Sequence, residues 1–124
     1  MDSILIVDDQ VGIRLLLKEL FAKEGLATHI ASNGVEAPHL FEQYEFDCVL
    51  LDVKMPGMDG IEVLKHIRSV NKTVPVFMMT AYGEQDLINQ TNEYNVQKFF
   101  TKPFNIFDVR DTIIQLLNHS KKDA

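Results

Sequence analysis

The sequence predicts an α/β fold, a doubly wound parallel sheet built from five strand–helix units. Continuous apolar runs, rather than alternating ones, are typical of strands that are buried on both faces of a parallel sheet. Several such short runs occur along the chain, and stretches with the apolar spacing of helices separate them. Right-handed crossovers between the strands would then place helices on both faces of the sheet.

The apolar runs that predict strands lie at residues 4–7, 29–31, 48–51, 76–79 and 98–100. The first helix is predicted by apolar spacing at i, i+3, i+4 and i+7, and Gly25 is a suitable stop; its face comprises Ile13, Leu16, Leu17, Leu20 and Phe21. The second helix starts near Asn33 and Glu36, which are spaced as in a capping box, and Pro38 is expected to delay or distort it. The remaining helices are predicted by the apolar positions 61, 64 and 67, then 87 and 88, and finally 109, 113, 116 and 117.

Length and composition favour one soluble domain. The chain has 124 residues, of which 46% are hydrophobic and 24% charged, as in ordinary globular proteins. We therefore expect a single domain over residues 1–124, with no room for an output domain. A net charge of −6 does not favour a nucleic-acid partner.

The cellular location is predicted from the absence of sequence features for membrane insertion, secretion and disulfide bonding. Its apolar runs are far shorter than the roughly 20 residues of a membrane span, and its start has no basic signal region. The single cysteine, Cys48, allows no internal disulfide and is expected to be a small core residue. We expect a cytoplasmic protein without a membrane partner, and nothing in the sequence suggests an obligate dimer.

Polar residues follow four of the five predicted strands. Asp8 and Asp9 come after the first strand, Asp52 after the third, Thr80 after the fourth and Lys102 after the fifth. Sheets of this kind bind ligands beyond the carboxyl ends of their strands. We therefore expect these side chains to converge at one edge of the sheet.

This combination suits phosphoryl transfer. Carboxylates that lie close together repel one another, and a divalent cation such as Mg²⁺ relieves that repulsion. Asp9 and Asp52 are the better ligand candidates, Asp8 would act indirectly, and a backbone carbonyl after Asp52 could complete the site. A lysine and a threonine hydroxyl would contact phosphoryl oxygens, and Asp52 would be the nucleophile. Taken singly, each residue is more often a helix cap, a turn residue or solvated surface, but four hits at four strand ends are hard to explain as capping.

The segments at 4–9, 50–60, 79–82 and 101–104 resemble the signature blocks of bacterial two-component response-regulator receiver domains. The resemblance covers essentially the whole chain. It implies a flavodoxin-like sheet of order 2-1-3-4-5 and a phosphoacceptor at Asp52. It also implies one Mg²⁺ held by Asp9, Asp52 and the main-chain carbonyl of Lys54, with Asp8 assisting. Lys102 would contact the phosphoryl group, and Thr80 would move toward it as a switch.

Within this family the segments 7–14, 79–84 and 102–104 resemble the stand-alone receivers of the phosphorelay that initiates sporulation. This implies a phosphoacceptor rather than a conventional enzyme, with magnesium-dependent, self-catalysed phosphorylation and dephosphorylation. The implied partners are sensor histidine kinases, a histidine phosphotransferase and an aspartyl-phosphate phosphatase. The alternative is a stand-alone effector of the chemotaxis type, which acts by phosphorylation-dependent protein binding.

In-line transfer from a histidine requires a docking surface around Asp52. The candidates for this surface are Gln10, Gly12, Ile13, Leu16, Tyr82, Pro103 and Phe104. Lys54 and Tyr82 are further expected to obstruct an attacking water and to lengthen the acyl-phosphate lifetime. Phe99 stands where the family often carries Tyr or His, and it is expected to stay inside in both states.

Other functions fit less well. A phosphohydrolase of the haloacid-dehalogenase type needs Asp-x-Asp, and this chain has Lys54 where the second acid belongs. In a flavodoxin-like electron carrier, Asp8 and Asp9 would repel the cofactor phosphate. The complete set of site residues argues against a degenerate receiver that only binds. None of the four histidines is predicted to be catalytic or to bind metal; they are His29, His39, His66 and His119.

Overall fold

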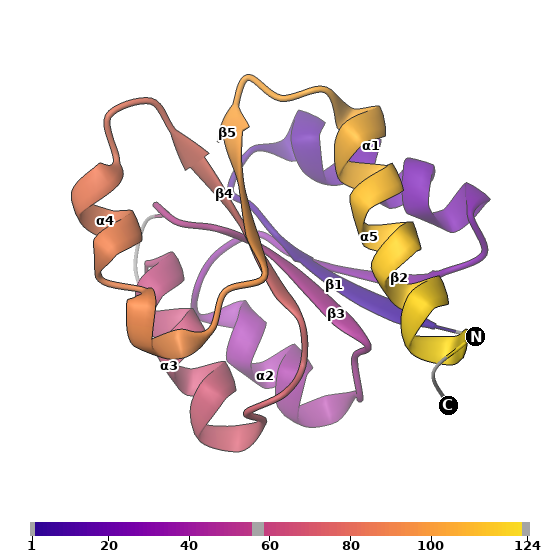
Figure 1. The fold of residues 1–124 in the computed structure, drawn as a ribbon, viewed down its shortest axis with the longest axis horizontal. Helices are drawn as coiled ribbons and strands as arrows, with labels where there is room; N and C mark the ends of the chain where they lie inside the picture. Colours follow the sequence, from indigo (N-terminus) through magenta and orange to yellow (C-terminus); the bar gives the residue numbers. More distant parts are fainter. Residues whose placement is uncertain (1, 56–58, 123–124) are drawn as a thin grey trace.

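The fold is a central parallel sheet with helices on both faces (Figure 1). A computed structural model describes residues 2–55 and 59–122, so part of the predicted 50–60 signature block lies outside the described residues. The strands are β1 (Ser3–Val7), β2 (Ala27–Ala31), β3 (Cys48–Asp52), β4 (Val76–Ala81) and β5 (Lys98–Lys102). They are all parallel and lie in the order β2-β1-β3-β4-β5. The predicted fold class and the strand order that the resemblance implies are both confirmed.

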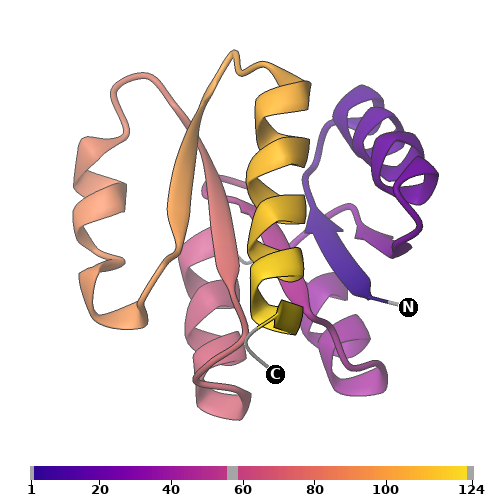
Figure 2. The ribbon, with the colours of Figure 1, turned by 45° about the vertical axis from the view of Figure 1, so that its right-hand side comes forward.

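The helices are α1 (Val11–Lys23), α2 (Glu36–Gln43), α3 (Gly60–Val70), α4 (Gln85–Asn89) and α5 (Ile106–Lys122). A short 3₁₀ turn, η1 (Asn92–Tyr94), follows α4. Helices α1 and α5 cover one face of the sheet, and α2 and α3 cover the other (Figures 1 and 2). No helix in the described part of the chain is long and apolar enough to cross a membrane.

Two hydrophobic cores follow from this layering. Strand side chains alternate between the faces, so Leu5 and Leu51 join the core under α2 and α3, while Ile6 and Leu50 join the core under α1 and α5. Every residue of β3 is buried, as expected for a central strand of a parallel sheet. Cys48 lies in the second core with no exposed surface, which confirms its predicted place.

Helix α1 corrects one detail of the predicted apolar face. Leu17 and Phe21 are fully buried and Ile13 is half-buried, but Leu16 is 48% exposed. The helical wheel treats all five apolar positions alike, whereas the sheet and α5 cover only part of that face. The packing therefore leaves Leu16 in solvent, together with Leu15 on the opposite side.

The start of α2 differs from a simple capping box. The Asn33 side chain accepts from the backbone N–H of Val35 and Glu36, at 2.8 and 2.9 Å, as predicted for a cap. The Glu36 carboxylate instead accepts from the backbone N–H and hydroxyl of Ser32. Helix α2 begins only at Glu36, so Pro38 falls in its first turn, where a missing N–H costs little.

Candidate functional site

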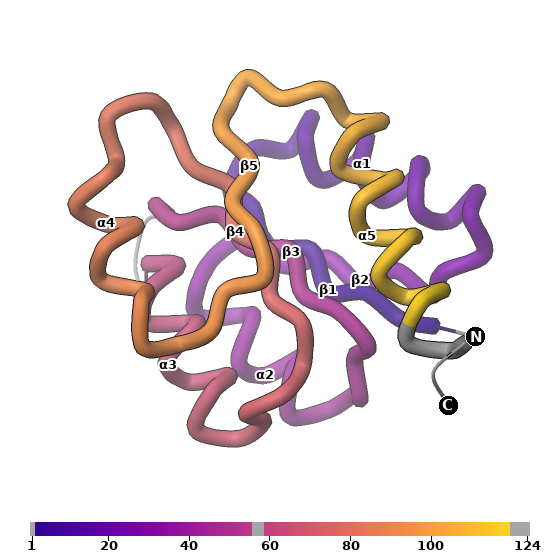
Figure 3. Tube along the Cα trace, viewed as in Figure 1, coloured from indigo at the N-terminus to yellow at the C-terminus, as the bar shows by residue number. Residues whose placement is uncertain are grey.

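Charged side chains meet at the carboxyl end of the sheet. Asp8 follows β1, whereas Asp52 and Lys102 are the last residues of β3 and β5. The Lys102 ammonium lies 3.0 Å from Oδ2 of Asp8 and 3.1 Å from Oδ2 of Asp52. Figure 3 traces how β4 and β5 run into their following loops at this same end of the sheet. Parallel pairing therefore brings together groups that are 50 and 94 residues apart in the chain.

The acidic residues differ in exposure. Asp8 is fully buried and Asp52 is 6% exposed, whereas Asp9 is exposed to solvent. Oδ1 of Asp8 accepts from the Gln10 N–H at 2.8 Å, and the Arg14 guanidinium donates to the Asp8 carbonyl at 2.8 Å. Gln10, the N-cap of α1, makes no side-chain cap hydrogen bond. Asp8 therefore has two roles: its Oδ1 closes an Asx turn at the start of α1, and its Oδ2 contacts Lys102 in the site.

The three carboxylates fit a hard divalent cation. Asp8, Asp9 and Asp52 each offer an oxygen, and these oxygens lie within 4.8 Å of one another. Magnesium prefers such oxygen ligands and keeps some of its waters, which the exposed side of Asp9 allows. The donor set is therefore of the right chemistry and spacing for Mg²⁺.

Burial and neighbouring charges perturb the two central groups. Desolvation raises the pKa of Asp52 to about 6, the charge of Asp8 raises it as well, and Lys102 partly offsets both effects. Desolvation opposes protonation of Lys102, but its hydrogen bond to Asp8 and the charges of Asp52 and Asp8 more than offset this, so its pKa lies above the ordinary value. The site thus holds more negative charge than its one lysine can balance.

Thr80 presents an unsatisfied hydroxyl. It lies near the end of β4, is 1% exposed, and its Oγ1 has no hydrogen-bond partner among the described residues. Buried polar groups are nearly always hydrogen-bonded, and an unmade bond costs about 1–3 kcal/mol. A buried hydroxyl without a partner is therefore available to a ligand that reaches this end of the sheet.

The loops after β3 and β4 lie beside Asp52 and Thr80 at the carboxyl end of the sheet. Lys54 is exposed, and its backbone N–H lies 3.4 Å from Oδ1 of Asp52. Tyr82 is 96% exposed because it occupies the corner of a tight turn whose next residue, Gly83, has a φ of 91°. A type II turn needs such a φ at its third position, where glycine is favoured. Both side chains are thus open to solvent, each two residues beyond a site residue, Asp52 and Thr80.

Two residues of the resembling segments for which no role was predicted, Glu84 and Gly60, also shape the site. Glu84 returns to β4, where its carboxylate accepts from the backbone N–H of Ala81. Gly60 begins α3 directly beneath β3, and a Cβ there would lie 2.0 Å from the Asp52 carbonyl oxygen. The Tyr-Gly-Glu order of the turn could have indicated the first contact. No local signal indicates the second contact, because it depends on how α3 packs against β3.

The predicted partner surface is partly exposed. Gln10, Gly12, Leu16 and Pro103 are exposed, and Ile13 is half-buried. Phe104, expected on a loop of uncertain burial, is half-buried and packs against Phe100, with ring centroids 6.5 Å apart. Phe99 is also half-buried and contacts the core under α2 and α3. Only part of each aromatic ring is therefore open to a partner.

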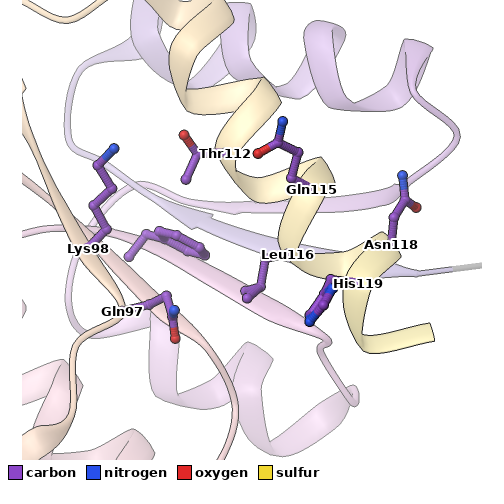
Figure 4. A pocket seen from close by; sticks show the side chains of 8 residues that line it. Gln97, Lys98, Thr112, Gln115, Leu116, Asn118 and His119 are labelled. Atoms are coloured by element: carbon purple, nitrogen blue, oxygen red, sulfur yellow. The ribbon is translucent and has the colours of Figure 1, made fainter. Parts of the chain in front are cut away.

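A separate cavity of about 600 Å³ lies between the start of β5 and the C-terminal half of α5 (Figure 4). Gln97, Lys98 and Gln115 line it above an apolar floor of Phe77 and Leu116. None of the predicted site residues is among its described lining. The cavity is thus distinct from the acidic cluster at the carboxyl end of the sheet.

Comparisons with known proteins agree with this geometry. Residues 4–114 match the response regulator receiver domain. The chain is 47% identical over 116 residues to Sporulation initiation phosphotransferase F of Bacillus subtilis, a match that covers 94% of both chains. It is 41% identical over 114 residues to the Regulatory protein AtoC of Escherichia coli, where it spans only 24% of the longer protein.

Solved structures give the same result. A CheY-like response regulator receiver domain protein from Methanospirillum hungatei superposes with a TM-score of 0.92 at 27% identity, covering 100% of this chain and 99% of that one. The chemotaxis protein CheY4 of Vibrio cholerae superposes with a TM-score of 0.84 at 28% identity, covering 93% of this chain and 98% of that one. From its sequence match, its sheet and its relatives together, the chain belongs to the response regulator receiver domain family.

Proposed function

We propose that this receiver is a phosphorelay intermediate, which accepts a phosphoryl group on Asp52 from a histidine kinase and passes it to a histidine phosphotransferase. The observation that carries the proposal is the contact of Lys102 with both Asp52 and Asp8, beside the unpartnered hydroxyl of Thr80. A nucleophile, a fixed cation and a free donor at one site are what phosphoryl transfer requires.

Asp9, Asp52 and the main-chain carbonyl of Lys54 would hold one Mg²⁺, with Asp8 assisting indirectly. The spacing of the three carboxylates within 4.8 Å supports this assignment. The ion would supply positive charge to the phosphoryl oxygens.

Asp52, Lys102 and Thr80 would each have a separate role in the phosphoryl transfer. A carboxylate oxygen of Asp52 forms the bond to phosphorus, the P–N bond to the donor histidine breaks, and the electron pair stays on that nitrogen. Lys102 leaves its contact with the Asp52 carboxylate to balance a phosphoryl oxygen while it remains near Asp8. The Thr80 hydroxyl moves toward a second phosphoryl oxygen and gains the hydrogen bond that it lacks. Transfer onward to a second histidine reverses these steps.

The docking surface for both histidine proteins would surround Asp52. Its candidates are Gln10, Gly12, Ile13, Leu16, Tyr82, Pro103 and Phe104. The exposure of Leu16 and Tyr82, at 48% and 96%, supports a patch that a partner helix would cover. Leu15, which is 56% exposed, extends apolar surface along α1 beyond this set.

Similarity to a sporulation phosphotransferase along nearly its whole length supports the relay and a role in sporulation initiation. We propose that the 1–124 receiver works alone in the cytoplasm as a monomer, through sensor kinases, a phosphotransferase and an aspartyl-phosphate phosphatase. Phe99 would stay inside in both states, because its ring already contacts the core and cannot donate outward. A relay protein presents the phosphoryl group itself and so needs no large switch.

The test is a two-step labelling experiment. The protein is phosphorylated with a labelled histidine kinase and Mg²⁺, and a histidine phosphotransferase is then added. We expect label on the wild type, none on Asp52→Asn, and its passage to the phosphotransferase. A protein that takes label but never passes it to any histidine would be an effector of the chemotaxis type, and the relay would be rejected.

A further inference from the structure

The turn between β4 and α4 holds a carboxylate against the candidate site. The Glu84 backbone N–H donates to the Ala81 carbonyl at 3.4 Å, and Oε1 of Glu84 accepts from the Ala81 N–H. Two hydrogen bonds between the same two residues therefore close the turn. Tyr82 is held at its exposed corner as a result.

The register of the sheet fixes where the Ala81 N–H points. Successive residues of a strand direct their backbone groups to opposite neighbours. The carbonyls of Pro75 and Met79 accept from β3 or the residue after it, whereas the carbonyl of Val76 accepts from Gln97 before β5. Odd-numbered residues of β4 therefore face β3, and Ala81 is one of them.

The Ala81 N–H lies beyond the last backbone hydrogen bond between β3 and β4. Asp52, the last residue of β3, pairs with Met79, and the N–H of the following residue donates to the Met79 carbonyl. Past this point β4 has no strand partner on that side among residues 2–55 and 59–122, so the Ala81 N–H faces the Asp52 end of the site. It is a backbone donor directly adjacent to the unpartnered Thr80 hydroxyl.

The structure assigns these two donors different states, because the Thr80 hydroxyl is free and Glu84 occupies the Ala81 N–H. We propose that Glu84 is a positioning residue whose carboxylate competes with a phosphoryl oxygen on Asp52 for the Ala81 N–H. This inference rests on the proposed function of Asp52 as phosphoacceptor. Phosphorylation would displace the carboxylate, loosen the turn and free Tyr82 from its fixed corner.

The experiment measures competition directly. Trifluoroberyllate, an analogue of a phosphoryl group on a carboxylate, is titrated with Mg²⁺ into wild type, Glu84→Ala and Glu84→Gln. Glu84→Ala removes the carboxylate that competes for the Ala81 N–H, so trifluoroberyllate should bind about three- to tenfold more tightly. The gain should be smaller in Glu84→Gln, because its amide oxygen still accepts from the Ala81 N–H. Asp86→Asn removes a nearby exposed charge from the first turn of α4 and should bind like wild type.

A second measurement needs no phosphoryl analogue. Amide hydrogen exchange at Ala81 in the metal-free protein should be faster in Glu84→Ala than in wild type or Asp86→Asn, because the N–H loses its acceptor. Equal or weaker trifluoroberyllate binding by Glu84→Ala, or unchanged exchange at Ala81, would overturn the inference. If wild type neither binds the analogue nor takes label at Asp52, the proposed function fails instead, and the exchange rate alone still decides whether Glu84 holds the Ala81 N–H.

Discussion

The raised pKa of Asp52 makes a quantitative prediction about folding stability. Burial and the neighbouring Asp8 raise this pKa from 3.8 to about 6 in the folded, metal-free protein. Between pH 4 and pH 6 the folded state therefore holds a proton that the unfolded state has released, so stability falls as the pH rises. Above about pH 6 both states are ionised, and the penalty stays constant. Replacing Asp52 with Asn should remove this penalty.

The size of the effect follows from the shift. Two pKa units correspond to about 3 kcal/mol, and screening by the solvent that reaches the cluster beside the exposed Asp9 reduces this to about 1–2 kcal/mol. We expect Asp52→Asn to match wild type in its free energy of unfolding near pH 4 and to exceed it by about 1–2 kcal/mol above pH 6.5.

The assay is urea unfolding, followed by far-ultraviolet circular dichroism in the presence of a chelator, at intervals from pH 4 to pH 8. Glu36→Gln is a control of opposite sign, because hydrogen bonds from Ser32 lower the pKa of Glu36. Its stability deficit should develop below pH 4.5, as the pH rises from the lowered pKa of the folded state to the ordinary value, and should stay constant across nearly all of the assayed range. A gain in Asp52→Asn that is the same at every pH, or a loss above pH 6, would refute the electrostatic argument.

Four further substitutions test other parts of the site. Asp8→Asn should lower the pKa of Asp52, because Asp8 is the second cause of its elevation, and carboxyl NMR titration would report this. Lys54→Ala and Tyr82→Ala should shorten the acyl-phosphate lifetime if these exposed side chains obstruct water, and unchanged dephosphorylation rates would reject that role. Gly60→Ala should destabilise the fold by about 3 kcal/mol or more in thermal unfolding, since its Cβ would lie 2.0 Å from the Asp52 carbonyl oxygen.

The parts of the fold that follow from local pattern were predictable. Continuous apolar runs identify strands buried on both faces, and the polar residue after each run then lies at the carboxyl end of the sheet. This is why Asp8, Asp52 and Lys102 could be expected together before any distance was known. The strand order is not a local property of the sequence, and only the resemblance to the receiver family predicted it.

Packing decides what local pattern leaves open. Leu16 and Leu17 have equivalent places in the apolar spacing of α1, but only Leu17 faces the sheet. Arg68 is a further example, since its guanidinium donates to backbone carbonyls of Val74, Tyr94 and Asn95, in segments before and after β4. Nothing near Arg68 in the sequence indicates partners 26 and 27 residues away.

The same distinction between local sequence and packing applies to Asp52. Local sequence provides the carboxylate, but its reactivity depends on Asp8 and Lys102, which reach it from other strands. In the metal-free protein, one lysine is shared between two buried carboxylates, and desolvation leaves Asp52 with a raised pKa. A cation that binds the acidic cluster would relieve the repulsion between Asp8 and Asp52, and it would thereby favour the ionised form of Asp52, which is the form the proposed phosphoryl transfer requires. The proposed function therefore implies that ion binding and phosphorylation are coupled through Asp8 and Asp52: without Mg²⁺ their negative charges would repel each other, and a larger fraction of Asp52 would be protonated and unable to act as a nucleophile.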